Sequence, residues 1–312
     1  MALMPSRVAL SPIVLFVYNR PWHTRQTIEA LQKNKLANKS ELFIYSDAAK
    51  THKDATSVKE VRDYIHNVTG FKRTQIIERD KNWGLAGSII DGVTSIVNEY
   101  GKVIVLEDDL VTSPFFLKFM NDALSFYKDE ARVMHISGWN YPLQQDGYEE
   151  TLFIRGTSCW GWATWADSWA YFEKNIQKLL DTFSDDDKYQ LDYDGVADMW
   201  RQVEMNHVKK IDTWAIFWYA SVFKHNGLCL HPTKTLACNI GHDGSGEHCG
   251  DSTMYDYDVS HTQVQTFSSE IIENKNAMLE IQAFFKENKR SFCARCVALM
   301  KRAIGRLRVG RL

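Results

Sequence analysis

The first 110 residues alternate short apolar runs with segments that are apolar at every third or fourth position. Continuous apolar runs bounded by polar residues are typical of buried strands, and a 3.6-residue spacing is typical of helices packed on a sheet. The predicted strands cover 11–19, 41–47, 74–80 and 102–109, and the predicted helices cover 21–34, 55–68 and 84–101. This alternation predicts an α/β fold with a mostly parallel sheet and helices on both faces.

The pattern changes after residue 110. The later predicted elements are an amphipathic helix at 115–130, a strand at 133–140, an aromatic-rich block at 152–172 and a polar, glycine-rich loop at 239–252. A further helix is predicted within 211–227, with Asp212 at its N-cap and Gly227 beyond its end.

Composition favours a folded protein with one asymmetry of charge. The chain has 312 residues, 45% of them hydrophobic, and a formal net charge of −2. The segment 286–312 holds nine basic residues and one acid, Glu287, so the tail is strongly basic while the body is acidic. We expect a single domain over residues 1–285, followed by the basic tail.

The sequence shows no signal peptide and no apolar run long enough for a membrane-spanning helix. The six cysteines in a chain of this length are typical of reduced thiols in a cytoplasm. We therefore expect a cytoplasmic protein.

The stretch KVIVLEDDLVTSPFF, at 102–116, ends a predicted buried strand in three carboxylates: Glu107, Asp108 and Asp109. Charges removed from water are costly unless they are paired or bind a metal. Hard cations such as Mg²⁺ and Mn²⁺ prefer carboxylate oxygens and retain substrate phosphates among their ligands. The alternative is a solvated cluster of acids in a loop.

Polar residues also follow the other predicted strands: Arg20 after the first, Asp47 at the end of the second and Arg79 at the end of the third. In open α/β sheets, ligands bind beyond the carboxyl ends of the strands. These side chains are therefore expected to converge on one edge.

The motifs VIVLEDDLVTSPFFLKFMN, YNRP, SDAAK and RDKNWGLAGSI resemble glycosyltransferases of the GT-A fold. The Glu-Asp-Asp-Leu form is similar to that of the Golgi N-acetylglucosaminyltransferase that starts hybrid and complex N-glycans. FIRGTSCWGWATWADSW and NIGHDGSGEH resemble segments of bacterial glycosyltransferases of surface-polysaccharide loci. The resemblance covers about residues 10–250 and implies a nucleotide-binding half at about 10–110 and an acceptor half at about 111–285.

The resemblance also implies roles for individual residues. The residues it places at a nucleotide sugar are Arg20 and Asp47 at the base and ribose, Arg79, Asn82 and Trp83 at the uracil and sugar side, and Glu107 and Asp108 at the sugar and ribose. Asp109 would hold the Mn²⁺ or Mg²⁺ ion that bridges the diphosphate. Because Glu107 fills the first place of the Asp-X-Asp pattern, ligation by one acid rather than two is expected.

Asp212 is the candidate general base. An inverting transfer needs a carboxylate that takes the proton of the acceptor hydroxyl, and an acid at a helix start beside Trp214 and Trp218 is expected to be held and partly desolvated. The alternative is a plain N-cap without chemistry. Glu204 and Asp198 are weaker candidates.

The segment GHDGSGEHC fits a loop that closes over a diphosphate, with Ser245 as a donor. His242 or His248 would add a metal ligand, and the resemblance favours His248. A zinc site that includes Cys249, and an ordinary surface turn, are the alternatives.

Four tryptophans crowd the aromatic block. Trp165 and Trp169 are four apart on a predicted helix, which favours core packing. Trp160 and Trp162 flank Gly161 and are the predicted sugar contacts.

In the tail, Val297, Met300, Ile304 and Leu307 recur at helical spacing among basic residues. This predicts an amphipathic helix on an anionic membrane surface, and the alternatives are a disordered tail or nucleic-acid binding by charge. Cys293 and Cys296 form an isolated Cys-X-X-Cys motif that has no second cysteine pair to act with.

Together these features predict a metal-dependent glycosyltransferase, expected to be inverting, that uses a UDP-sugar and a glycan or lipid-linked acceptor. Its expected setting is O-antigen or capsule synthesis, peripheral to the inner face of the cytoplasmic membrane and without nucleic acid. The alternatives are a nucleotidyltransferase, disfavoured because VYNRPWHT lacks a glycine-rich phosphate loop, and an inactive sugar-binding scaffold.

Overall fold

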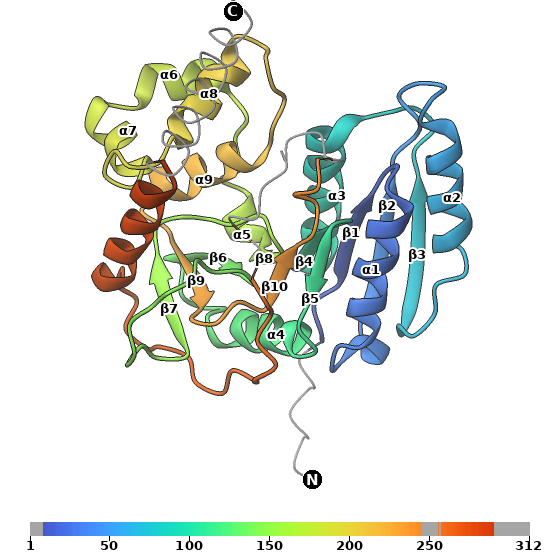
Figure 1. The fold of residues 1–312 in the computed structure, drawn as a ribbon, viewed down its shortest axis with the longest axis horizontal. Helices are drawn as coiled ribbons and strands as arrows, with labels where there is room; N and C mark the ends of the chain where they lie inside the picture. Colours follow the sequence, from blue (N-terminus) through green and yellow to red (C-terminus); the bar gives the residue numbers. More distant parts are fainter. Residues whose placement is uncertain (1–8, 245–254, 256, 290–312) are drawn as a thin grey trace, which may run out of the picture.

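A computed structural model describes residues 9–244, 255 and 257–289 of the protein. One eight-stranded sheet runs through them in the order β3-β2-β1-β4-β8-β6-β9-β7 (Figure 1). Its strands are β1 (Ile13–Val17), β2 (Glu41–Ser46), β3 (Arg73–Glu78), β4 (Lys102–Glu107), β6 (Val133–Ser137), β7 (Thr151–Ile154), β8 (Trp162–Trp165) and β9 (Leu228–Pro232).

The sheet is mostly parallel, as predicted. β1 pairs in parallel with β2 and β4, β2 with β3, and β6 with β9. Only β8 and β7 run against their neighbours. The carboxyl ends of β1, β2, β3 and β4 therefore lie along one edge, where the predicted polar clusters were expected to meet.

The three predicted helices of the first half are confirmed as α1 (Pro21–Gln32), α2 (Ala55–Ile65) and α3 (Gly84–Tyr100). Pro21 opens α1, where its missing N–H costs no hydrogen bond. Gly101 ends α3 with φ of +76°, a left-handed conformation that glycine adopts without a steric penalty.

Side chains that alternate along the strands enter two cores, one on each face of the sheet. Leu15 and Leu106 pack in one core with Ile28 of α1 and Val61 of α2. The other core lies against α3, and its central residues are Val14, Phe16, Val105, Ile89, Val93 and Val97. Helices therefore cover both faces, which confirms the predicted fold class.

The second half is more helical than the sequence pattern predicted. Its helices are α4 (Phe116–Phe126), α5 (Ala166–Trp169), α6 (Ile176–Thr182), α7 (Asp185–Leu191), α8 (Met199–His207) and α9 (Ala215–Lys224), and a short 3₁₀ turn, η1 (Ala37–Lys39), lies in the first half. Trp165 is the last residue of β8 rather than part of a helix, so the predicted helical pairing of Trp165 with Trp169 is wrong.

A small second sheet was not predicted. β5 (Leu110–Thr112) pairs antiparallel with β10 (Ala237–Asn239), and Leu110 lies opposite Asn239. This pairing brings the chain after β10 beside the acids that precede β5.

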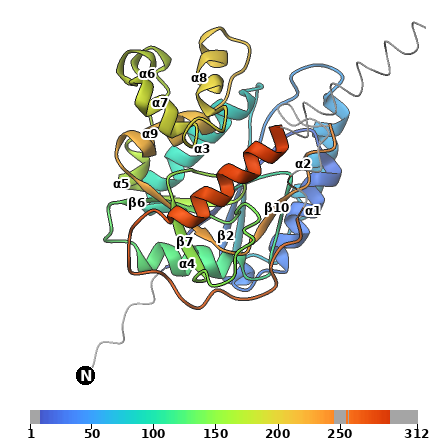
Figure 2. The same ribbon diagram turned by 60° about the vertical axis from the view of Figure 1, so that its left-hand side comes forward.

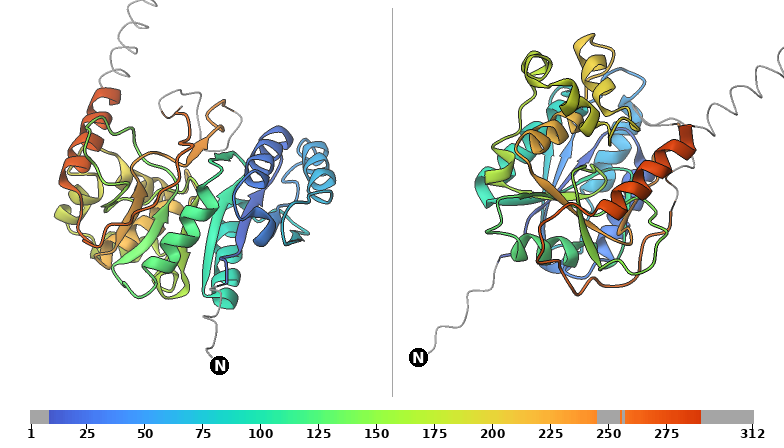
Figure 3. Two further views of the ribbon diagram at one scale, coloured as in Figure 1. Left: turned by 90° about the horizontal axis from the view of Figure 1, so that it is seen from below. Right: turned by 90° about the vertical axis from the view of Figure 1, so that its left-hand side faces the viewer.

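Residues 275–289 form a further helix, so helical structure continues past the predicted boundary at residue 285. It lies across the half of the molecule that carries β6, β7 and β9, on the side away from α1 and α2 (Figures 2 and 3). Ala277, Met278 and Ile281 enter a third core together with residues of α7, α8 and α9. The amphipathic helix predicted for the tail falls in 290–312, outside the described residues.

Within the described part of the chain, no helix is both long and apolar enough to cross a membrane.

Candidate functional site

Glu107 is the last residue of β4, and Asp108 and Asp109 form the turn that leads into β5. The preceding strand residues are fully buried, so the strand delivers the acids to the carboxyl edge of the sheet from inside the core. Asp108 and Asp109 are themselves buried, whereas Glu107 is partly exposed. The solvated-loop alternative is therefore wrong for the two aspartates.

Arg20, which follows β1, binds both aspartates. Its Nη2 atom lies 2.6 Å from Oδ1 of Asp108 and 2.5 Å from Oδ2 of Asp109. Its Nε atom donates to the same Asp108 oxygen at 3.2 Å. Guanidinium suits this task because it stays charged and presents several donors in a fixed fork. The structure thus brings together three residues that the sequence placed at this edge.

Backbone and hydroxyl groups hold the turn from the side of α1. The N–H of Tyr18 donates to Oδ2 of Asp108 at 3.3 Å. The hydroxyl of Thr27 donates to the carbonyl oxygen of Asp108 at 2.8 Å and accepts from the N–H of Leu110 at 3.1 Å. The turn is therefore pinned at both of its ends.

The chain after β10 lies directly against Asp109. The N–H of Ile240 donates to the carbonyl oxygen of Asp109 at 2.8 Å. A Cβ atom at Gly241 would lie 2.2 Å from Oδ2 of Asp109, so only glycine fits here. One residue further, His242 is close enough for the Asp109 carboxylate to raise its pKa, although burial has the larger effect and lowers the pKa overall.

The site carries more negative than positive charge. Although Glu107 is partly exposed, protein atoms surround its carboxyl group. This desolvation, together with repulsion from Asp109 and Asp108, raises its pKa to about 8. Burial also raises the pKa of Asp108, although Arg20 opposes this shift. The guanidinium has an increased pKa because the two aspartates outweigh the effect of its burial. Asp108 and Asp109 thus share one guanidinium, and a further positive charge would also favour the ionised form of Glu107.

Among the described residues, no three His, Cys, Asp or Glu side chains form a set that would hold a metal ion alone. Mg²⁺ is usually bound by one or two carboxylates together with waters and substrate phosphates, so such a set is not required. Two buried carboxylates beside one guanidinium leave an excess of negative charge, which fits a bound divalent cation.

Asp47 has a structural task that the sequence did not reveal. Its carboxylate accepts from the backbone N–H groups of Trp83 and Gly84, each at 2.9 Å, where α3 begins. It also accepts from the N–H of Ala48 at 2.9 Å and from Nδ2 of Asn82 at 3.1 Å. The carboxylate oxygens are therefore occupied by the protein itself rather than aimed at a ribose.

Arg79 and Trp83 lie together at the ends of β3 and α3. The guanidinium stands 4.1 Å from the ring centroid of Trp83 and pairs with Asp91. The Trp83 side chain is 42% exposed, which is unusual for a tryptophan and leaves its ring accessible. The predicted neighbourhood of Arg79, Asn82 and Trp83 is thus present.

The two predicted sugar contacts differ in their surroundings. Trp162 is fully buried and stacks on Trp214, with ring centroids 5.2 Å apart, so it packs in the core and does not face a sugar. Trp160 is partly exposed and lies edge-on to His242, with ring centroids 5.3 Å apart. Trp160 therefore contacts the residue that follows Gly241, whose backbone lies against Asp109.

Asp212 is neither an N-cap nor desolvated, and both of these predictions are wrong. α9 begins at Ala215 with Trp214 as its N-cap, and the Asp212 side chain is 79% exposed and paired with Lys174. The N–H of Thr213 donates to Oδ1 of Asn206 at 3.0 Å, which holds the chain outside the helix at this point. Glu204 and Asp198 are also exposed.

Ser245, His248 and Cys249 lie outside the described residues. Of the same loop, Asp243 is described, and its Oδ2 atom lies 3.1 Å from Nε2 of His23 on α1.

The sequence analysis did not assign Thr27, His23 or Trp214 to the site. The side chain of Trp214 hydrogen-bonds Glu107. The first two had a detectable signal. On the buried face of α1, polar His23, Thr24 and Thr27 take places where a purely structural helix would carry apolar residues. A polar stripe on the inner face of a helix at the carboxyl edge of a sheet points toward a site. Trp214 gave no such signal.

No family model and no curated protein match the chain. One solved structure similar to it is that of residues 1–349 of TarS from S. aureus. The two chains are 11% identical, the match covers 72% of this chain and 59% of that chain, and the TM-score is 0.40. The match thus spans less than two thirds of that TarS chain. Mouse xyloside xylosyltransferase 1 is 9% identical over 70% of this chain and 83% of its own, with a TM-score of 0.38.

The mannosyltransferase PcManGT from Pyrobaculum calidifontis, in complex with GDP-Man and Mn²⁺, is 8% identical over 71% of this chain and 74% of its own, with a TM-score of 0.34. Similarity at this level does not show the activity of this chain.

Proposed function

We propose that the protein is a glycosyltransferase of the GT-A type that moves a sugar from a nucleotide diphosphate sugar, with UDP as the expected nucleotide, to a hydroxyl of a glycan or lipid-linked acceptor. The observation that carries this proposal is the acid cluster at the carboxyl end of β4, where Asp108 and Asp109 share the guanidinium of Arg20 and Glu107 lies beside them. Such an edge of a parallel sheet is where nucleotide ligands bind.

Within this proposal, Asp109 holds Mn²⁺ or Mg²⁺, and His248 is a second ligand predicted from sequence alone. The bound ion would stabilise negative charge on the departing diphosphate. Arg20 orients the two aspartates, and the partly exposed Glu107 is left to accept hydrogen bonds from the donor sugar. Ser245 is a further proposed donor to the diphosphate.

The nucleoside side of the site lies at the ends of β2 and β3. Trp83 offers an exposed ring backed by Arg79, which suits stacking with a base. Asp47 acts on the nucleotide indirectly, because it fixes the positions of Asn82 and Trp83. Trp160 is the proposed aromatic contact of the donor sugar.

Asp212 remains the proposed base of an inverting transfer, and its exposure would leave it accessible to an acceptor hydroxyl. The likeness of the Glu-Asp-Asp-Leu motif to the Golgi enzyme, the role in bacterial surface-polysaccharide synthesis and the attachment of the basic tail to the cytoplasmic membrane are predictions from sequence alone.

The test is a panel of nucleotide sugars incubated with the purified protein, Mn²⁺ and simple glycan acceptors. The proposal predicts release of a nucleoside diphosphate together with a lengthened acceptor. Release of pyrophosphate from a nucleoside triphosphate and a sugar phosphate would instead identify a nucleotidyltransferase. Sugar binding without any turnover would favour a scaffold.

A further inference from the structure

Four aromatic rings pack together beside the chain that follows β10. Trp139, Trp160, His242 and Tyr255 form this ring cluster, with Trp160 at its centre. The ring centroid of Trp160 lies 4.8 Å from that of Trp139, 5.3 Å from that of His242 and 5.1 Å from that of Tyr255. His242 and Tyr255 complete the contact at 5.5 Å.

The ring cluster is linked to the acid cluster through the backbone of Gly241 and to the C-terminal helix through a ring contact. On one side, His242 follows Gly241, whose backbone rests on the carboxylate of Asp109. On the other side, Phe284 of helix 275–289 lies 5.8 Å from Tyr255, between ring centroids. Two ring contacts and the backbone of residues 241–242 therefore connect a helix near the end of the described sequence to the proposed donor site.

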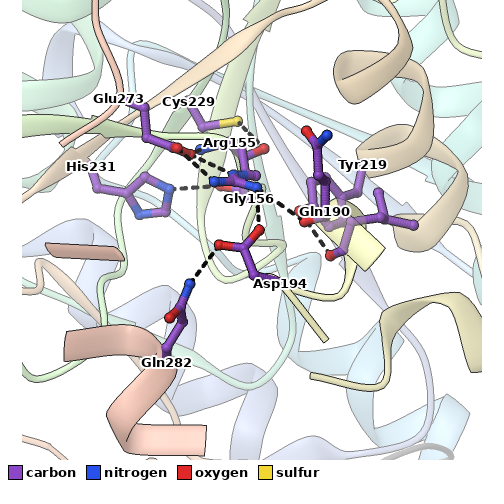
Figure 4. A network of polar contacts seen from close by, with 10 residues as sticks. Arg155, Gly156, Gln190, Asp194, Tyr219, Cys229, His231, Glu273 and Gln282 are labelled. Carbon is purple, nitrogen blue, oxygen red and sulfur yellow. Dashed lines mark hydrogen bonds and ion pairs between the residues drawn. The ribbon is translucent and has the colours of Figure 1, made fainter. Parts of the chain in front are cut away.

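The helix is held by a charged network that fixes its position (Figure 4). Arg155 donates to both carboxylate oxygens of Glu273, at 2.7 and 2.8 Å, just before the helix begins. Arg155 also donates to Asp194 at 3.0 Å, and Gln282 of the helix donates to the other oxygen of Asp194 at 2.8 Å. Charge-assisted hydrogen bonds of this kind have defined geometry, so Phe284 is presented to Tyr255 from a fixed base.

We infer that Phe284 is a positioning residue, which through Tyr255 sets where His242 and Trp160 stand beside the acid cluster. Its effect on donor binding rests on the proposed function. The physical reason is close packing: removal of the ring that packs on Tyr255 leaves space, and neighbouring rings shift to fill part of it.

The adjacent residue provides a matched control. Phe285 is on the same helix and is also partly buried, and its ring contacts Tyr141, Tyr193 and Phe284. Phe284 shares the contact with Tyr141, and the contact with Tyr255 is the one that distinguishes it. Phe284→Leu and Phe285→Leu therefore remove the same kind of ring from the same helix, and each removes a contact with Tyr141. Only Phe284→Leu removes the direct contact with Tyr255. Leucine keeps much of the apolar volume, so both variants are expected to fold.

The first readout does not depend on enzymatic activity. In protein labelled with ¹³C in its histidine rings, the His242 signal is assigned by its loss in His242→Gln. We expect this signal to move in Phe284→Leu, because ring orientations around His242 change, and to keep its position in Phe285→Leu. If Phe284→Leu does not fold, Phe284→Met replaces it.

The second readout is the dissociation constant of UDP in the presence of Mn²⁺. We expect binding to weaken about threefold to tenfold in Phe284→Leu, the range that one aromatic pair accounts for, and to stay within about twofold of the unaltered protein in Phe285→Leu.

A His242 signal that is unmoved in Phe284→Leu, or moved equally in Phe285→Leu, would overturn the inference. If the unaltered protein bound no nucleotide, the proposed function would fail, and the histidine signals alone would decide the inference.

Discussion

The Nη2 atom of Arg20 lies 2.6 Å from Oδ1 of Asp108 and so ties the end of β1 to the turn after β4. The same atom reaches Asp109, which makes Arg20 the cation shared by two buried acids. Much of the proposed site depends on this one side chain.

Replacement of Arg20 by Met should destabilise the protein strongly. Removal of one partner of a buried ion pair leaves uncompensated charge, which costs about 3–5 kcal/mol of unfolding free energy. Denaturant unfolding measures the loss. The matched control is Lys59→Met, which breaks the exposed pair with Asp63 and should cost about 0–1 kcal/mol. Equal losses in the two variants would contradict the account.

Asp47→Ala tests whether Asp47 stabilises the protein or contacts nucleotide directly. Loss of its hydrogen bonds to Trp83 and Gly84 should lower the unfolding free energy by about 1–2 kcal/mol, as for other residues that cap a helix start. Thermal unfolding of the nucleotide-free protein gives the measurement. An unchanged melting temperature with lost nucleotide binding would show that Asp47 acts on the ligand instead.

The raised pKa of Glu107 predicts a pH dependence of stability in the absence of divalent metal. Its pKa rises from an ordinary 4.5 to about 8 on folding, so between these values the folded protein retains a proton that the unfolded chain has lost. Stability should therefore fall as pH rises from about 4.5 to about 8. Unfolding in the presence of a chelator at pH 5 and pH 8 measures the difference.

Glu107→Gln should remove part of that slope, because glutamine does not titrate. Glu204→Gln, at an exposed position on α8, should leave the slope as it is. A slope that is the same in all three proteins would mean that the Glu107 carboxyl does not titrate in this range.

Asp212→Asn tests the proposed base. If Asp212 takes the proton of the acceptor, the transfer rate should fall about 10²- to 10⁴-fold, the usual contribution of general base catalysis. Stability should hardly change, because the side chain is exposed. Lys174→Met, which removes only its partner, should have a far smaller effect. A transfer rate in Asp212→Asn within about threefold of normal would assign the base elsewhere.

The first half of the fold was predictable because its signals are local. Pro21 and Gly101 mark the ends of α1 and α3, and the apolar runs mark the strands. β5 was not predictable, because three residues after an acid cluster carry little pattern and the partner strand, β10, lies far away in sequence.

The candidate site was predicted in part for the same reason. Arg20, Asp108 and Asp109 follow strands whose parallel arrangement brings them together. The role of Trp162 could not be predicted from the sequence, because a tryptophan beside a glycine is compatible with both a sugar contact and core packing. Its stacking on Trp214 in the structure shows that it belongs to the core. The N-cap prediction for Asp212 failed because Asn206, from another element, holds the chain there.

The most direct test of the central claim is calorimetric titration of UDP into the protein with and without Mn²⁺, beside Asp109→Asn and the exposed control Asp63→Asn. The account predicts metal-dependent binding that is lost in Asp109→Asn and retained in Asp63→Asn. Two results would contradict it. One is that no common nucleotide binds, and the other is that UDP binds equally tightly to all three proteins whether or not Mn²⁺ is present.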